Sequence, residues 1–238
     1  MAKKSLSLSL RNVYETLSIC FPTVLDAALG RVTKQVCDDR LESWCAKVVR
    51  NLGTSLHVVG HEHIENGKAY LVMSNHQSHY DVPVLFHVLG SNLRMVAKLE
   101  LFSLPVFGAA LREAGFIAVD RSNRVRAIES LEVAKAKLAG GVSVWIAPEG
   151  TRSKTGELLP FKKGGFVLAL ETKWPVLPVT IQGTREALPA NGLRSSPGAS
   201  VRVTIHRPIH PSAYAELPAK VRRERFIGDV RAAIASAL

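Results

Sequence analysis

The stretch AYLVMSNHQSHYD, residues 69–81, passes from a short apolar run into a polar turn that carries two histidines and an aspartate. A short apolar run that is bounded by turn residues is typical of a buried strand. In sheets that are covered by helices, ligands bind in loops at the carboxyl ends of the strands. The polar turn at 74–81 is therefore the first candidate functional site.

Similar apolar runs recur along the chain after Gly53, and segments with helical spacing separate them. The predicted strands are 56–60, 69–74, 93–98, 115–120, 142–147, 176–182 and 201–207. The predicted helices are 81–90, 100–113, 123–139, 162–172 and 216–237. Because such alternation is typical of an α/β fold, we expect a single mixed sheet covered by helices. Residues 183–200 are rich in turn residues and are predicted to be a surface excursion.

A helical hairpin is predicted before the sheet. Apolar residues recur at helical spacing over residues 10–29 and again over 41–52, and Gly30 and Gly53 are natural stops. Pro22 is expected to kink the first helix. The hairpin is amphipathic, and its apolar faces either pack on the core of the domain or enter one face of a membrane. The periodicity leaves both alternatives open.

Composition limits the class of partner. The chain has 238 residues, of which 47% are apolar and 21% charged, so it is long enough for one sizeable core. A net charge of +11 favours a polyanionic partner, such as nucleic acid, an anionic membrane surface or a phosphorylated substrate. The basic residues are spread along the chain, and only 6% of residues are aromatic, so no platform for stacking bases is evident. We therefore expect no nucleic acid partner.

The cysteines and the apolar runs bear on the compartment. Cys20, Cys37 and Cys45 are odd in number and show no C-x-x-C spacing, which argues against a disulfide framework and for a reducing compartment. Arg11 and Glu15 interrupt the first apolar run before the core of a signal peptide can form. The sequence has no run of about 18 apolar residues, so no membrane-spanning helix is predicted.

The histidines of the polar turn have three interpretations. His76 and Asp81 are close enough across a turn for the carboxylate to accept the imidazole N–H, which would make His76 a general base. A metal site would instead use His76, His79 and Asp81, completed by another histidine. The candidates for that ligand are His57, His61, His63 and His87. In the third interpretation Asp81 caps a helix and His76 is an ordinary loop residue.

Cations follow three other predicted strands. Lys98, Arg121 and Arg152 each lie at or just after a predicted strand end. In the turn APEGTRS, residues 147–153, Gly150 lets the backbone approach a ligand, and an arginine offers a planar fork that suits phosphate. Convergence of these cations would bind a phosphate monoester. Alternatively, each cation is solvated and the Pro-Glu-Gly sequence is only a tight turn.

Together these stretches resemble, in order and spacing, four motifs of the 1-acylglycerol-3-phosphate O-acyltransferase family of membrane-associated glycerolipid acyltransferases. The four stretches are NHQSHYD (75–81), GFIAVDR (115–121), APEGTRS (147–153) and PVLPVTIQGT (175–184). The resemblance extends over about residues 54–210. Ala118 and Ala147 stand where the family commonly has larger residues, a difference that bears on substrate fit more than on chemistry.

The resemblance implies transfer of a fatty acyl group from a thioester of coenzyme A or acyl carrier protein to the 2-hydroxyl of lysophosphatidate, which gives phosphatidate. His76 would remove the hydroxyl proton and Asp81 would orient His76, with no metal and no other cofactor. The implied substrate-binding residues are Lys98, Arg121, Glu149, Gly150, Thr151 and Arg152. Val176 and Pro178 would help to form the acyl pocket.

The expected lipid substrate and the amphipathic pattern of the hairpin also imply a location. Residues 1–52 would form a membrane-associating hairpin and residues 53–238 the catalytic domain. The protein would be monotopic or peripheral, on the cytoplasmic face, with an anionic membrane surface as a partner. The apolar stripe expected to enter the membrane includes Leu17, Phe21, Trp44 and Val48.

Competing functions are an acyltransferase for another lysolipid headgroup, a metal-dependent lipid hydrolase and a lipid-binding module without turnover. The presence of both His76 and Asp81 argues against the binding module. The sequence leaves the acyl chain length and the choice between the two thioester donors open.

Overall fold

A computed structural model describes residues 4–238, except for the side chain of Arg124, so residues 1–3 of the predicted hairpin lie outside the described residues. Its core is a seven-stranded sheet in the order β1-β7-β6-β2-β5-β3-β4. The strands are β1 (Ser55–Val59), β2 (Leu71–Ser74), β3 (Leu93–Lys98), β4 (Ile117–Val119), β5 (Ser143–Ile146), β6 (Val176–Gln182) and β7 (Ser200–Ile205). Neighbouring strands are parallel except for β6 and β7. The predicted α/β fold with a single mixed sheet is therefore confirmed.

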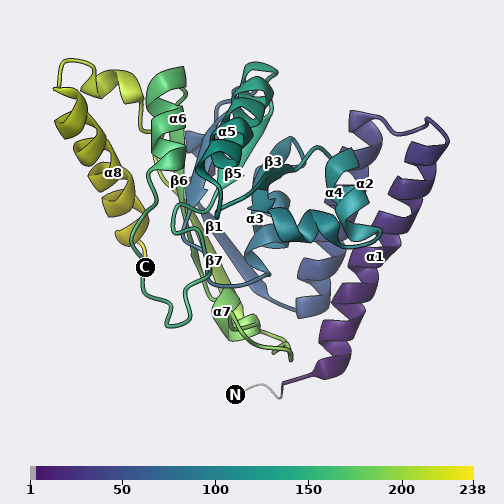
Figure 1. Ribbon diagram of the computed structural model, residues 1–238. Coiled ribbons are helices and arrows are strands. Elements are labelled where there is room, and N and C mark those ends of the chain that lie inside the picture. Colours follow the sequence, from purple (N-terminus) through teal and green to yellow (C-terminus); the bar gives the residue numbers. More distant parts are fainter. Residues whose placement is uncertain (1–3) are drawn as a thin grey trace.

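Helices cover both faces of the sheet (Figure 1). The helices are α1 (Leu6–Ala28), α2 (Lys34–Leu52), α3 (Asp81–Leu89), α4 (Phe107–Glu113), α5 (Arg124–Ala139), α6 (Gly164–Thr172), α7 (Thr184–Ala187) and α8 (Ala219–Ala235). Three short 3-10 helices are η1 (His61–His63), η2 (Leu99–Ser103) and η3 (Pro211–Tyr214). Helices α5, α6 and α8 form one layer, and α1 to α4 lie on the other side (Figure 1).

The alternation of side chains along β2 explains the two layers. Leu71 and Met73 belong to the core cluster that also contains Phe166 of α6 and Phe226 of α8. Val72, between them, belongs to the cluster that contains residues of α2 and α3. Successive side chains of a strand point to opposite faces, and both faces here are buried. This double burial is the reason that the strand reads as an unbroken apolar run.

The segment predicted as one helix over 100–113 is divided in the structure. Residues Leu99–Ser103 form η2, and α4 begins only at Phe107. Leu104, between them, has an extended backbone with φ −70° and ψ 131°. Pro105 accounts for the break, because a proline disfavours helical backbone in the residue before it.

The hairpin shares the core of the sheet. Leu41, Cys45 and Val49 of α2 lie in the same cluster as Val84 of α3. The predicted boundary after residue 52 therefore does not separate two hydrophobic cores. Helix α1 differs from α2, since it leaves a long apolar face exposed. The exposed apolar residues of α1 are Leu6, Leu10, Val13, Tyr14, Leu17, Phe21 and Leu25.

Two members of the predicted membrane stripe face inward, which corrects the sequence-based expectation. Val48 is buried, and Trp44 packs against the same cluster. The Trp44 Nε1–H also donates to Thr16 Oγ1 at 3.0 Å, so its polar edge is used within the hairpin. Within residues 4–238, no helix combines the length and the apolar character that crossing a bilayer requires.

The segment 183–200 is also more than a surface excursion. It begins with α7, and Leu188, Ala190 and Ser195 are buried within it. Ser195 pairs through its backbone with Ser5 at the start of α1. The segment therefore packs between the sheet and the hairpin, a contact that its turn-rich composition did not reveal.

Candidate active site

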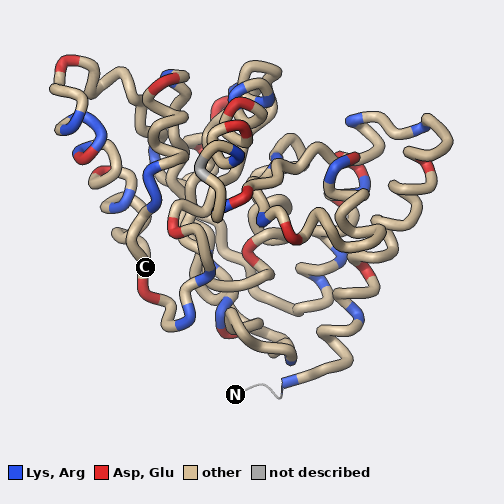
Figure 2. The backbone as a smooth tube through the Cα atoms, viewed as in Figure 1, with Lys and Arg blue, Asp and Glu red and all other residues tan. Residues whose placement is uncertain are grey.

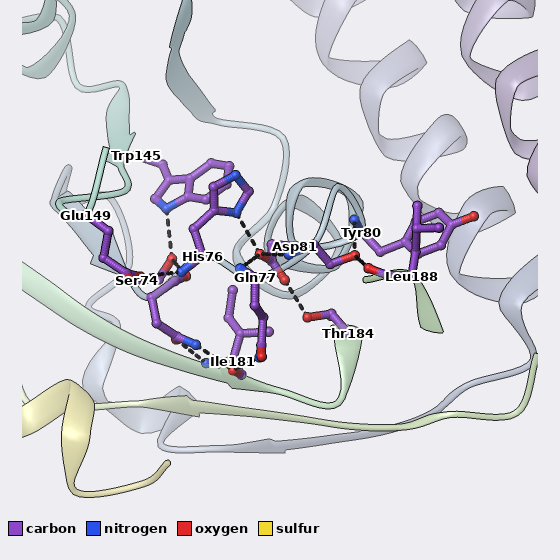
Figure 3. Close-up of polar contacts among 12 residues, drawn as sticks. Ser74, His76, Gln77, Tyr80, Asp81, Trp145, Glu149, Ile181, Thr184 and Leu188 are labelled. Carbon is purple, nitrogen blue, oxygen red and sulfur yellow. Dashed lines mark hydrogen bonds and ion pairs between the residues drawn. The ribbon is translucent and has the colours of Figure 1, made fainter. Parts of the chain in front are cut away.

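The loop between β2 and α3 carries the predicted dyad (Figure 3). His76 Nδ1 lies 2.6 Å from Asp81 Oδ2. Asp81 is the first residue of α3 and its side chain is fully buried, whereas the imidazole of His76 is 19% exposed. Since Asp81 engages Nδ1, Nε2 is the ring nitrogen that remains to accept a proton from a substrate.

Asp81 is fixed by three further hydrogen bonds. Its Oδ2 accepts the backbone N–H groups of Gln77 at 2.7 Å and Ser78 at 2.9 Å. Its Oδ1 accepts the hydroxyl of Thr184 at 2.5 Å. These donors satisfy the two carboxylate oxygens of Asp81 in a buried position. Thr184 ends the fourth motif stretch, but no sequence pattern assigned it a role because it lies far from Asp81 along the chain.

An aromatic side chain packs against the imidazole of His76. Trp145 of β5 meets the His76 ring edge to face, with centroids 5.7 Å apart and an interplanar angle of 87°. The indole is itself held, because its Nε1–H donates to Ser74 Oγ at 3.0 Å. Trp145 was not among the predicted site residues, although it stands two residues before the APEGTRS turn.

The APEGTRS turn makes hydrogen bonds to the backbone of His76. The Glu149 carboxylate accepts the His76 N–H at 2.8 Å and the Leu159 N–H at 2.8 Å. The N–H of Ser153 donates to the His76 carbonyl at 2.7 Å. Burial raises the pKa of Glu149, and these backbone donors oppose that rise. Glu149 was predicted to bind substrate, but in the structure its carboxylate positions the main chain of His76.

Arg152 follows in the same turn and has an unused donor. Its Nη1 is buried and, among the described residues, has no hydrogen-bond partner. Burial lowers the pKa of the guanidinium, and the charge of Asp81 raises it. Buried polar groups are almost always paired, so an unpaired cationic donor beside the dyad indicates an anionic ligand.

The other two predicted cations lie at adjacent strand ends. Arg121 donates to the carbonyl of Gly150, which adopts a left-handed backbone with φ 71°. Lys98 ends β3 and pairs with Val119 of β4, two residues before Arg121. Its ammonium group is exposed and lies 2.9 Å from Glu100 Oε1. The structure thus joins Arg121 to the APEGTRS turn, while Lys98 lies on the surface and pairs with Glu100.

Comparison with known proteins identifies the family. The family model for acyltransferases matches residues 55–182, from β1 to the end of β6. The chain belongs to the acyltransferase family. The matched region includes the dyad, the APEGTRS turn and all three cations.

Two curated relatives and one solved structure show the extent of the likeness. A chloroplastic 1-acyl-sn-glycerol-3-phosphate acyltransferase of Brassica napus is 38% identical over 59% of this chain and 40% of its own length. The human 1-acyl-sn-glycerol-3-phosphate acyltransferase alpha is 34% identical over 73% of this chain and 62% of its own length. The chain thus spans about half the length of these relatives. The crystal structure of the LPA acyltransferase PlsC from Thermotoga maritima is 27% identical, with a TM-score of 0.73 and 97% coverage of both chains.

The two residues that were predicted to form the acyl pocket lie in the sheet rather than in the dyad loop. Val176 is fully buried at the start of β6, where it pairs with Leu71 at the start of β2, whereas His76 follows the end of β2. Pro178 is buried in the same strand. Both residues pack in the sheet, and the acyl-pocket assignment stays a prediction. Thr151, in contrast, is exposed within the APEGTRS turn.

The metal interpretation lacks a ligand set. Within the part of the chain that the structure describes, no three His, Cys, Asp or Glu side chains gather closely enough to hold a metal ion. Among the predicted ligands, His76 contacts Asp81. The side chain of His79 is exposed. The observed arrangement is that of a buried carboxylate, a half-buried imidazole and a neighbouring cation.

Proposed function

We propose that this acyltransferase moves a fatty acyl group from a thioester of coenzyme A or acyl carrier protein to the 2-hydroxyl of lysophosphatidate, forming phosphatidate. The observation that carries the proposal is the unpaired Nη1 of Arg152 beside the His76–Asp81 dyad. Lysophosphatidate presents a hydroxyl and a phosphate monoester on one glycerol, and such a molecule needs a base and a cation in neighbouring positions. The relatives of Brassica napus and human, which are named as 1-acyl-sn-glycerol-3-phosphate acyltransferases, support the same acceptor.

The mechanism follows from the dyad. Arg152 and Arg121 hold the acceptor phosphate, and His76 Nε2 takes the proton of the 2-hydroxyl as the oxygen attacks the thioester carbonyl. Asp81 stabilises the imidazolium that forms. The tetrahedral intermediate collapses as the carbon–sulfur bond breaks, and the leaving thiolate recovers the proton from His76. An ester and a free thiol result, without an acyl-enzyme intermediate.

One assay separates the candidate functions. Purified protein is incubated with lysophosphatidate and an acyl thioester, and thiol release and phosphatidate are both measured, with and without a chelator. We expect equal amounts of thiol and phosphatidate and no effect of the chelator. Lipid cleavage that the chelator abolishes and zinc restores would establish the metal-dependent hydrolase. Binding without thiol release would establish the lipid-binding module, and other lysolipids test the headgroup.

Arg152→Ala is expected to raise the KM for lysophosphatidate by roughly 10- to 100-fold, the range for losing one charge-assisted hydrogen bond. A phosphate that is held equally in the ground and transition states contributes mainly to KM, so kcat should fall less. Steady-state kinetics with each substrate varied in turn measures both constants. Arg202→Ala, which removes an exposed arginine from β7, is the matched control. A defect confined to the thioester KM would show that the phosphate binds elsewhere.

We propose further that α1 lies in one face of a membrane and gives the site access to lipid acceptors. The support is the exposed apolar face of α1, which includes Leu10, Phe21 and Leu25. Transferring an acyl chain of about 16 carbons into water costs on the order of 10 kcal/mol, so an enzyme that engages the bilayer avoids this barrier. Lys and Arg occur on both helical layers (Figure 2), and Arg11 is exposed on α1 itself. An anionic surface is therefore the proposed partner, and the unpaired cysteines favour its cytoplasmic face.

The double variant Leu17→Ser/Phe21→Ser is expected to lower binding to anionic vesicles by roughly 10-fold or more, because two large apolar side chains no longer enter the lipid. Turnover of detergent-dispersed lysophosphatidate should stay within about threefold of the parent, since both side chains are exposed on α1. Vesicle flotation measures the binding. Leu193→Ser, which changes a leucine that is 82% exposed and does not belong to α1, is the control. Unchanged flotation of the double variant would remove α1 from the membrane contact.

A further inference from the structure

Tyr80, the residue before Asp81, anchors the dyad loop to α1. Its side chain is buried, and Figure 3 shows it on the opposite side of Asp81 from His76. The Tyr80 hydroxyl accepts a hydrogen bond from Asn12 Nδ2 at 2.9 Å. It also lies 2.6 Å from Ser195 Oγ. The hydroxyl thus joins the dyad loop, α1 and the segment after α7 at one buried point, which we call the Asn12–Tyr80–Ser195 clamp.

Each partner in the clamp is itself held. Asn12 Oδ1 accepts from Asn51 Nδ2 of α2 at 3.0 Å. Ser195 Oγ lies 2.8 Å from Ser9 Oγ, and the Ser195 N–H donates to the same oxygen at 2.9 Å. Asn12 is 6% exposed and Ser195 fully buried. A buried polar network whose members are all satisfied rigidifies the segments that it connects, whereas a partly satisfied one is costly.

The segment after α7 holds the dyad loop at other points too. The Ser78 hydroxyl donates to the Leu188 carbonyl at 2.8 Å, and Thr184 donates to Asp81. The Tyr80 N–H donates to Ser78 Oγ at 3.1 Å. The backbone on both sides of Asp81 is therefore fixed by contacts that come from α1 and from residues 184–195.

We propose that Asn12 and Tyr80 are positioning residues for the reaction: through the clamp, α1 sets the placement of Asp81 and so the orientation of His76. The inference rests on the proposed function. A small misplacement of a catalytic group is costly because the reaction needs one geometry. Helix α1 consequently has two roles, since one of its faces is exposed and apolar while the other carries Asn12 to the dyad loop.

The test uses the full chain with Tyr80→Phe, Asn12→Ala and the double variant. Each single variant is expected to lower kcat about 3- to 10-fold, the range for one lost hydrogen bond, with both KM values within about twofold of the parent. The double variant should be no slower than the slower single variant, because both break the same clamp. Thr23→Val is the matched control. It removes the acceptor of Arg40 Nη1, a contact between α1 and α2 that lies about three helical turns beyond Asn12.

A second measurement does not depend on turnover. Amide hydrogen exchange at Gln77 and Ser78, whose N–H groups donate to Asp81, should accelerate about 3- to 10-fold in Tyr80→Phe and stay unchanged in Thr23→Val. Unchanged kcat and exchange in Tyr80→Phe would overturn the proposal, as would an equal loss of kcat in Thr23→Val. If the parent transfers no acyl group, the proposed function fails. Amide exchange then decides the clamp by itself, and Tyr80→Phe decides alone if Asn12→Ala does not fold.

Discussion

Replacing His76 by alanine is expected to lower kcat by about 100- to 10,000-fold, the contribution of a general base. The reason is geometric, because Asp81 fixes Nδ1 at 2.6 Å and leaves Nε2 as the proton acceptor. The acceptor KM should change little, since the proposed phosphate contacts come from Arg152 and Arg121 rather than from the imidazole. Steady-state kinetics with detergent-dispersed lysophosphatidate and saturating thioester gives kcat directly.

His79→Ala is the matched control for this prediction. It removes the other imidazole of the same turn, which is exposed and makes no contact with Asp81 among the hydrogen bonds of the described residues. We expect its kcat to stay within about threefold of the parent, because it takes no part in proton transfer. Equal losses in the two variants would assign the effect to the turn as a whole, and full activity of His76→Ala would exclude His76 as the base.

The sheet was predictable because its strands are buried on both faces. Leu71, Val72 and Met73 pack into two different helical layers, so their strand reads as one apolar run that ends where the polar dyad loop begins. Residues 183–200 were misjudged for the opposite reason. Their turn-rich composition describes the local backbone correctly, but it contains no information about the partner, and Ser195 is buried against α1.

The candidate site was predictable where its chemistry is local in sequence. His76 and Asp81 are five residues apart, and a carboxylate and an imidazole at that spacing can meet across one turn. The residues that hold them come from distant segments. Glu149 and Thr184 are 73 and 103 residues from the groups that they contact, so only the folded chain reveals their roles.

The hairpin shows a related limit. Periodicity placed Trp44 and Val48 on an apolar face correctly, but it did not indicate whether that face meets lipid or protein. In the structure α2 uses its apolar face for the core, and the exposed face belongs to α1. Asn12 lies on the buried side of α1, where a polar residue would look like a mere interruption of the helical pattern.

Asp81→Asn is expected to lower kcat by at least about 100-fold, nearly as much as His76→Ala. The structure makes this substitution a clean removal of charge. Oδ2 accepts from His76, Gln77 and Ser78, so the amide of asparagine must place its oxygen there, because its NH₂ group would face three donors. The NH₂ group then meets the Thr184 hydroxyl, which can rotate to accept a hydrogen bond. The loop is kept, but the carboxylate that stabilises the imidazolium is lost.

The matched control for Asp81→Asn is Thr184→Val, which removes one donor to Oδ1 and leaves the charge in place. It should lower kcat by only about 3- to 10-fold, the effect of a single hydrogen bond. Circular dichroism and thermal melting establish that each variant is folded before kcat is compared. If folded Asp81→Asn turns over at the parental rate, the negative charge has no part in catalysis and the dyad mechanism is wrong. If Thr184→Val is as slow as Asp81→Asn, the loss reflects the placement of residue 81 rather than its charge.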